Sequence, residues 1–317
     1  MGIRCGEMNL AVDARSLASL RGISRYTREM LVALDELDGV EVEAVVPDSR
    51  WANAKAALTG RPTIAKLTGA DVIWMPAPAP GAPGSPLVLT VHDLSWIERP
   101  DDFTAYERLW HRLMRFERLL RSADAVVCDD GSVAAALDER FGVDATVVAP
   151  GVSVPDKLVA AEREKPYFLY VGALEPRKGL DVLEQAWEQA GVDADLVLVG
   201  AGRSPIGVGE HLGLVPDDVL HGLYAGALAI VLPSYLEGFG FTPREAACHG
   251  VPSIVSDLPS LRLPGTLRVP PGDVDALAEA ITVMPSVRES LVATLPAPRS
   301  WHDAATDLVA VLRSVHQ

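Results

Sequence analysis

The sequence has few cysteines, no long apolar run and few aromatic residues. Its 317 residues contain three cysteines, Cys5, Cys128 and Cys248, which lie far apart in the chain. This odd and scattered set excludes a disulfide framework, and the absence of a CxxC or Cys/His cluster excludes a zinc site of the common kinds. No apolar stretch reaches the roughly 18 residues that a membrane-spanning helix needs.

Positive charge is also in short supply. The chain has 28 lysines and arginines against 43 acidic residues, for a net charge of −15. Nucleic-acid binding needs an excess of cations for phosphate contacts, so we expect no nucleic-acid partner. The first residues lack the apolar core of a signal peptide. Together with the free cysteines, this predicts a reducing, cytoplasmic setting.

What remains is a globular α/β composition, 49% hydrophobic and 22% charged. The length predicts about two domains. In the first half, predicted strands alternate with predicted helices; the strands are 8–13, 41–46, 71–75, 87–91, 124–128 and 145–149, and the helices are 23–37, 51–59, 104–121 and 132–140. The second half repeats the pattern, with strands 167–171, 195–199, 228–232, 252–255 and 266–269, and helices 178–190, 216–226, 242–249, 273–284 and 303–315. This alternation predicts two doubly wound parallel sheets, with a boundary in the proline- and charge-rich segment 150–166.

Ligands of such sheets bind at the carboxyl ends of the strands, so the residues that follow each strand are the candidates for ligand binding and catalysis. Arg177 and Lys178 follow strand 167–171 and open a predicted helix. Positive charge opposes the helix dipole there, which favours a bound anion, and the pair suits a diphosphate. The alternative is a solvated basic pair on a loop.

A second segment, 233–245, follows strand 228–232 and contains two glycines and two glutamates of interest. Glycines 238 and 240 permit a tight turn, and Glu237 and Glu245 are spaced E-x7-E. A carboxylate accepts two hydrogen bonds from a vicinal diol, so paired carboxylates suit sugars and ribose. The alternatives are surface exposure for Glu237 and, for Glu245 in the first turn of the helix, a capping role favoured by the dipole.

These segments resemble family 4 of the retaining glycosyltransferases, which have the GT-B architecture. The resemblance rests on 170–179, 233–247, 250–257, 273–278 and 300–302 in the second half, and on 21–26 and 90–94 in the first. It implies an α/β GT-B fold, in which two Rossmann-like doubly wound domains face each other across a cleft. Residues 1–155 would bind the acceptor and residues 156–300 the nucleotide sugar, while helix 301–317 would pack back on the first domain.

The resemblance also implies roles for individual residues. Arg177 and Lys178 would neutralise the diphosphate of the donor, Glu237 would hold hydroxyls of the sugar, and His92 would lie over the sugar near the point of attack. With these four as catalytic residues, the donor-binding residues would be Gly22, Gly172, Phe239, Gly240, Phe241, Thr242 and Glu245. Glu245 would hold the ribose, and Gly22 would let the backbone approach the distal phosphate.

The predicted function is therefore a retaining hexosyltransferase. The best guess for its donor is GDP-mannose, with a UDP-sugar next, and its acceptor would be a hydroxyl of a glycan, a lipid-linked molecule or a small molecule, as in polysaccharide biosynthesis. No cofactor is expected, nor a metal, because no DxD motif lies in a suitable loop; Asp129-Asp130 and Asp217-Asp218 are predicted to be acids at helix starts. The alternatives are a GT-B sugar-nucleotide epimerase and a catalytically silent sugar-nucleotide-binding subunit.

Segment 104–121 stands out in an acidic chain, since it contains five arginines and two glutamates. One interpretation is an amphipathic packing helix with a solvated basic face. The other is a peripheral contact with an anionic membrane surface or a lipid-diphosphate acceptor, which would place the protein at the inner face of the membrane.

Overall fold

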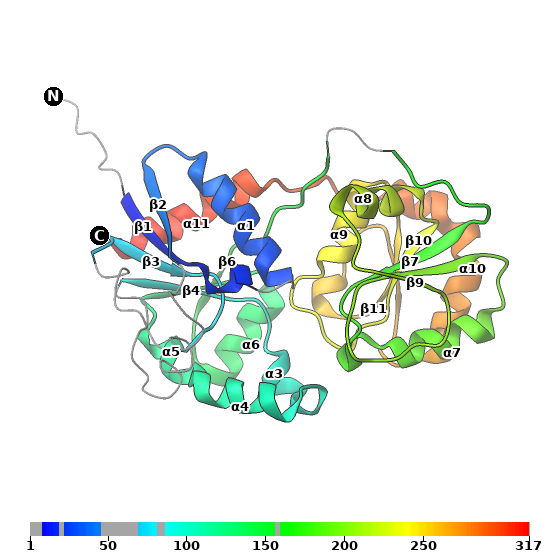
Figure 1. Ribbon diagram of the computed structural model, residues 1–317, viewed down its shortest axis with the longest axis horizontal. Helices are drawn as coiled ribbons and strands as arrows, with labels where there is room; N and C mark the ends of the chain where they lie inside the picture. Colours follow the sequence, from blue (N-terminus) through cyan, green and yellow to red (C-terminus); the bar gives the residue numbers. More distant parts are fainter. Residues whose placement is uncertain (1–7, 19–21, 46–68, 81–85, 156–158, 317) are drawn as a thin grey trace. The chain divides into compact units, whose positions relative to one another are not determined.

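The computed structural model describes residues 8–18, 22–45, 69–80, 86–155 and 159–316. They form two compact units, Met1–Gly151 together with Arg299–Gln317, and Val152–Pro298. Each unit is an α/β sandwich around one parallel sheet (Figure 1). The predicted helix 51–59 lies outside the described residues.

The first unit contains a six-stranded sheet in the order β2-β1-β3-β4-β5-β6, with every neighbouring pair parallel. Strands β3 and β4 are buried along their whole length because helices cover both faces of the sheet. The strands are β1 (Met8–Asp13), β2 (Val40–Val45), β3 (Val72–Met75), β4 (Leu87–Val91), β5 (Ala125–Cys128) and β6 (Ala145–Val147). The helices are η1 (Ala14–Ala18), α1 (Gly22–Asp35), α3 (Ser95–Glu98), η3 (Pro100–Asp102), α4 (Ala105–Met114), α5 (Phe116–Ser122), α6 (Gly131–Phe141) and α11 (Trp301–His316).

Helix α11, from the end of the chain, packs against α1, β3 and β4 of the first unit. Its Leu308 and Leu312 are fully buried, and the Trp301 ring meets the Tyr26 ring edge to face with centroids 5.8 Å apart. Gly151 lies against the backbone of Trp301 so closely that a Cβ would stand 2.3 Å from the Trp301 nitrogen. The last residues are therefore part of the core of the first unit.

The second unit contains a six-stranded parallel sheet in the order β12-β11-β10-β7-β8-β9. Because β8 lies on one side of β7 and β10 on the other, the winding direction reverses between β7 and β10. The strands are β7 (Tyr167–Val171), β8 (Asp195–Val199), β9 (Glu210–Gly213), β10 (Ala229–Leu232), β11 (Ser253–Ser256) and β12 (Thr266–Val269). The helices are η4 (Pro176–Lys178), α7 (Leu180–Ala190), α8 (Asp217–Gly226), α9 (Phe241–Cys248), η5 (Pro259–Leu261) and α10 (Val274–Val292).

The prediction of one helix over 104–121 is wrong, because Arg115 adopts a left-handed conformation, with φ of 54°, and separates α4 from α5. Residues two apart on a continuous helix point about 200° away from each other. Met114 and Phe116 are both buried in the same core cluster, which a continuous helix could not achieve. The break at Arg115 changes the helix direction, so that both side chains point into the same core.

Two further elements differ from the sequence expectation. Strand β9 was not predicted, because its residues are half exposed and lack an apolar run; it is held by pairing with β8. Helix α10 continues past Pro285 to Val292, where the prediction ends at 284. Ile281 and Met284, on the turn before Pro285, are buried and hold the helix in place. The ring of Pro285 removes only one hydrogen bond of the helix.

Candidate functional site

The candidate site of the second unit lies at the carboxyl ends of β7 and β10, the switch point where ligands of doubly wound sheets bind. The loop after β7 and the loop after β10 contact each other there, since the Tyr235 amide donates to the Arg177 carbonyl over 2.8 Å. The Thr242 hydroxyl donates to the carbonyl of Val171 over 3.1 Å. The structure thus brings together the two segments that the sequence singled out.

Gly179 explains how closely these loops approach. Its φ is +65°, and a Cβ at this position would stand 2.1 Å from the Pro233 carbonyl oxygen. An L-residue would therefore meet both backbone strain and a clash. Gly179 ends the short η4 turn, so the glycine holds Arg177 and Lys178 against the loop after β10.

Lys178 and Glu237 form a buried ion pair at this junction. The Lys178 Nζ lies 2.5 Å from Glu237 Oε1, and the Ser234 hydroxyl donates to the same oxygen over 2.6 Å. The two side chains are 11% and 10% exposed. Burial alone would raise the pKa of Glu237, but the charges of Lys178 and Arg177 and the hydrogen bonds from Lys178 and Ser234 outweigh it and lower that pKa. Glu237 is therefore an ionised counter-ion for Lys178 rather than an exposed surface acid.

Glu245 is buried on α9, with 5% exposure, and accepts a hydrogen bond from the Tyr224 hydroxyl over 2.6 Å. The expectation that it lies in the first helical turn is wrong. Helix α9 begins at Phe241, so Glu245 is in its second turn, beyond the capping positions. No local sequence signal points to Tyr224, which lies 21 residues earlier in the chain.

The loop before α9 is held by Arg244, a residue that the sequence reasoning missed. Its guanidinium donates to the carbonyls of Phe239 and Gly240 and lies 3.8 Å from the centroid of the Phe239 ring. Gly240 has φ of +72° and stands immediately before α9, and the Phe239 and Phe241 rings meet edge to face. Gly172, after β7, donates its amide to the Val199 carbonyl over 3.0 Å.

In the first unit, His92 follows β4 and is 12% exposed. Its Nδ1 lies 2.6 Å from Asp129 Oδ2 and its Nε2 lies 2.8 Å from the Pro76 carbonyl oxygen. Both nitrogens thus face acceptors, an arrangement that only the doubly protonated ring satisfies. Burial would lower the pKa of His92, but the charge and hydrogen bond of Asp129 outweigh it and raise that pKa.

The role predicted for Asp129 is therefore wrong, whereas that for Asp130 is confirmed. Asp130 caps α6 by accepting from the Ser132 amide, while Asp129 turns toward His92. Asp217 and Asp218 do occupy the first turn of α8, as predicted. A spatial argument could have found Asp129, since it follows β5 as His92 follows the neighbouring strand β4.

Gly22 is the first residue of α1, and a Cβ there would meet nothing within 4 Å. Packing of the described residues therefore does not require glycine at this position. Nearby in sequence, Asp13 and Arg15 form a buried pair at 2.5 Å, and Arg15 also donates to the Pro80 carbonyl. Sequence reasoning missed this pair.

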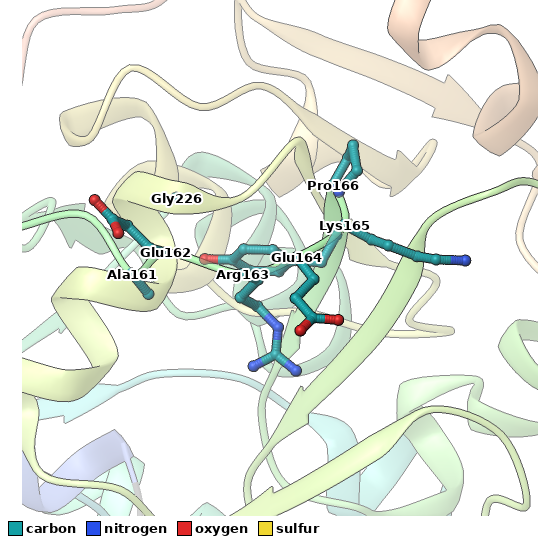
Figure 2. Close-up of a pocket in the computed structure, with 8 residues that line it drawn as sticks. Ala161, Glu162, Arg163, Glu164, Lys165, Pro166 and Gly226 are labelled. Carbon is teal, nitrogen blue, oxygen red and sulfur yellow. The ribbon is translucent and has the colours of Figure 1, made fainter.

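A cavity of about 490 Å³ lies at the amino-terminal end of the strands of the second sheet, next to the start of β7 (Figure 2). It is lined by residues 161–167 and Gly226. Arg163 lies over the Tyr167 ring and pairs with Glu210. Because the cavity is at the amino end of the sheet, it is separate from the switch point.

Within the described ranges, no helix is both long enough and apolar enough to span a bilayer. Among the same residues, no group of three or more histidine, cysteine or acidic side chains is placed to hold a metal ion.

Comparison with known proteins adds to this geometry. Residues 165–285 match the family described as glycosyl transferases group 1, and residues 55–154 match glycosyltransferase family 4. The chain is 34% identical to O-antigen chain mannosyltransferase B of Escherichia coli over 161 residues, which cover 44% of this chain and 39% of that protein. It is 27% identical to the O-antigen chain mannosyltransferase RfbU of Salmonella typhimurium, over 61% of this chain and 59% of that protein. The chain therefore spans less than two thirds of the length of these relatives.

Solved structures agree on the fold. A sucrose-phosphate synthase from Thermosynechococcus elongatus superposes with a TM-score of 0.71 at 20% identity, over 97% of this chain and 98% of that one. HepE of Anabaena, solved with UDP and glucose, gives a TM-score of 0.63 at 16% identity, over 98% and 97% of the two chains. These neighbours show the GT-B fold. The two family matches show that the chain belongs to the family 4 glycosyltransferases.

Proposed function

We propose that this protein is a retaining hexosyltransferase that uses a nucleoside-diphosphate sugar, with GDP-mannose as the first candidate donor. The observation that carries the proposal is the junction of Arg177, Lys178 and Glu237 at the switch point of the second sheet, with Glu245 on the helix that follows. The mannosyltransferase names of the sequence relatives support the choice of sugar. They do not bear on the acceptor, for which a glycan, a lipid-linked molecule and a small molecule remain candidates.

The proposed chemistry is electrostatic. The Lys178 ammonium donates to Glu237 at this junction. In the proposed function, the ammonium and the Arg177 guanidinium would bind the diphosphate and stabilise the charge that develops as the nucleotide leaves. The cations would in this way supply the charge that other transferases take from a metal ion, and no cofactor is proposed.

His92 has a narrower role in this proposal than that of a base. A doubly protonated imidazole has no lone pair with which to accept a proton from the acceptor hydroxyl. We infer that His92 contributes a fixed positive charge and orientation. In the proposed retaining transfer, the bond from the anomeric carbon to the phosphate oxygen breaks, and the acceptor oxygen bonds to that carbon from the same face. The departing phosphate is the base, since it takes the proton of the acceptor hydroxyl.

The test is a panel of sugar nucleotides, beginning with GDP-mannose and UDP-glucose, in which nucleotide release is followed with and without simple glycosides and in the presence of EDTA. Acceptor-dependent release of one nucleotide, and an α-linked product from an α-linked donor by NMR, are the expected results. An epimerised donor would support the epimerase instead, and binding without turnover would support a silent subunit. Lys178→Ala or Glu237→Ala with full turnover would contradict the site assignment.

Helix α4 supports a second, independent part of the proposal, which is peripheral contact of a cytoplasmic protein with an anionic membrane surface. Tyr106 and Leu109 are 75% and 51% exposed, and the exposed Arg108 and Arg112 lie beside them on the same helix. Exposed apolar side chains among arginines are typical of helices that lie in a lipid interface. The partition of Arg108→Gln/Arg112→Gln onto phosphatidylglycerol vesicles should fall about thirtyfold, since each of the two cations contributes about 1 kcal/mol near such a surface.

The matched control for this vesicle assay is Arg28→Gln/Arg140→Gln, which removes the same charge from exposed positions on α1 and α6 of the same unit. The control should partition like the wild-type protein. Equal losses in the two variants would show a general charge effect and would contradict docking through α4.

A further inference from the structure

Helices α8 and α9 meet through a set of polar aromatic side chains behind Glu245. Tyr224 and His221 are three residues apart on α8, while Glu245 on α9 and His249 just after it are four apart. Both spacings place the two residues of a pair on one face of the helix. The two helices pack against each other. Tyr224, Glu245 and His221 are buried, with at most 9% of each residue exposed.

The central contact is the bond from Tyr224 to Glu245. The phenol is fully buried and lies 2.6 Å from Oε2 of a carboxylate that is itself almost fully buried. This length is typical of a hydroxyl that donates to an ionised carboxylate, a bond stronger than one between neutral groups. The bond holds Oε2 in place and so restricts rotation of the carboxylate plane.

The orientation of the Tyr224 ring is itself supported. The His249 ring stacks on it with centroids 5.6 Å apart and planes inclined by 16°. His249 is held in turn by His221, whose Nδ1 lies 3.0 Å from His249 Nε2. Burial, and then the charge of His221, lower the pKa of His249 to about 4, so the stacked ring is neutral at neutral pH. The ring that stacks on Tyr224 therefore adds no positive charge that would draw the Glu245 carboxylate away from a ligand.

We propose that Tyr224, braced by His249 and His221, is a positioning residue that sets the Glu245 carboxylate for the vicinal hydroxyls of the nucleotide ribose. The inference rests on the proposed function, in which Glu245 holds the ribose. It goes further in naming a device on α8 that determines the preference for a ribose with both hydroxyls. A free carboxylate would rotate, and fixing it lowers the entropy lost on binding.

The test compares GDP and UDP with their 2′,3′-dideoxy counterparts by calorimetry on the full chain. Wild-type protein should bind the ribonucleotide of the preferred base more tightly than its dideoxy form. Tyr224→Phe should weaken ribonucleotide binding about tenfold, the usual scale of one hydrogen bond to a charged group. It should leave dideoxynucleotide binding unchanged, because that ligand does not contact the carboxylate.

Tyr167→Phe is the matched control. Its hydroxyl is also buried in the second unit and also donates over 2.7 Å, but to the Leu223 carbonyl rather than to Glu245. It should not change the ratio of ribonucleotide to dideoxynucleotide affinity. In addition, Tyr224→Phe combined with Glu245→Gln should lose no more ribonucleotide affinity than Glu245→Gln alone, since Tyr224 acts through that carboxylate.

The outcomes separate the inference from the function beneath it. Protein that binds neither GDP nor UDP contradicts the proposed function. Protein that prefers the ribonucleotide, but whose Tyr224→Phe variant keeps that preference or weakens both ligands equally, contradicts only the positioning role. Wild-type protein that binds both forms of the sugar equally overturns the positioning role and the ribose role of Glu245 together, while leaving glycosyl transfer to its own assay.

Discussion

The buried pair of Lys178 and Glu237 gives the sharpest prediction about the candidate site. Lys178→Met removes the ammonium with little change of shape, and Glu237→Gln removes the carboxylate charge but keeps an acceptor for Ser234. Each change leaves one charged group buried with its counter-ion gone. Each should therefore cost far more free energy of unfolding than an exposed ion pair would.

The size of the effect follows from the geometry. At 2.5 Å and an effective dielectric constant of about 20, the attraction is about 7 kcal/mol. Removing one ion also relieves its own desolvation cost, which is several kcal/mol. In Lys178→Met, moreover, Arg177 and Ser234 continue to stabilise Glu237. We therefore expect each single change to lower the free energy of unfolding by about 2 to 4 kcal/mol, and the double variant to lose at least about 1.5 kcal/mol less than the sum.

Hydrogen exchange measured by mass spectrometry on the strands β7 and β10 is the suitable assay, since a chain of two units does not unfold in one step. The pH dependence has a definite sign. The pKa of Glu237 is lowered from 4.5 in the folded protein, so its contribution is present above that value and is lost as the pH falls through the folded pKa. The deficit of Glu237→Gln should thus shrink in acid. Strictly additive single effects, or single losses below about 0.5 kcal/mol, would refute the description of a buried and coupled pair.

Three further changes test other parts of the structure. Gly179→Ala should destabilise the second unit and weaken nucleotide binding, because its Cβ would meet the Pro233 carbonyl at 2.1 Å; unchanged exchange on β7 and unchanged affinity would contradict this. Gly22→Ala should leave the melting temperature within about 1 °C of wild type, since its Cβ meets nothing within 4 Å, yet weaken donor binding if the backbone approaches a phosphate. Asp129→Asn should lower the pKa of His92, measured by imidazole NMR; a pKa that stays above the ordinary 6.5 would show that Asp129 does not control it.

The alternation of strands and helices could be read from the sequence because buried parallel strands are short apolar runs. Strands β7 and β8 begin and end at the predicted residues. The α-helices α7 to α10 of the second unit lie within a few positions of the prediction, apart from the far end of α10. The meeting of the loops after β7 and β10 also follows from sequence logic, because parallel strands end at one edge of a sheet.

The exceptions lack a local signal. Strand β9, with the sequence EHLG, is held by backbone pairing to β8 rather than by apolar side chains, so no run of hydrophobic residues marks it. The helix breaks at Arg115 because Met114 and Phe116 are both buried in one core cluster, and this burial is a tertiary contact that the local sequence does not show. The apolar residues of 104–121 fit one helical period, so the pattern does not show that the helix is interrupted at Arg115.

Side-chain partners were the least predictable part of the site. His92 and Asp129 are 37 residues apart, and Lys178 and Glu237 are 59 apart. In a chain with 43 acidic residues, composition cannot select one partner from the rest. The order of strands in the sheet could narrow the choice, because both His92 and Asp129 follow neighbouring strands, but that order is itself a tertiary fact.

The acidic composition has a consequence at these sites. Three largely buried cations each pair with a carboxylate of the same unit; they are Lys178, His92 and Arg15, whose side chains are 9% to 12% exposed. A buried cation without such a partner would be deprotonated or would turn toward solvent. The acids therefore keep the cations ionised and oriented before any ligand arrives. In the proposed function, an anionic donor that binds beside Lys178 would share it with Glu237 rather than meet a bare charge. Nonspecific anions would gain little from such a site, and selectivity would depend on the groups proposed to bind the sugar and the ribose.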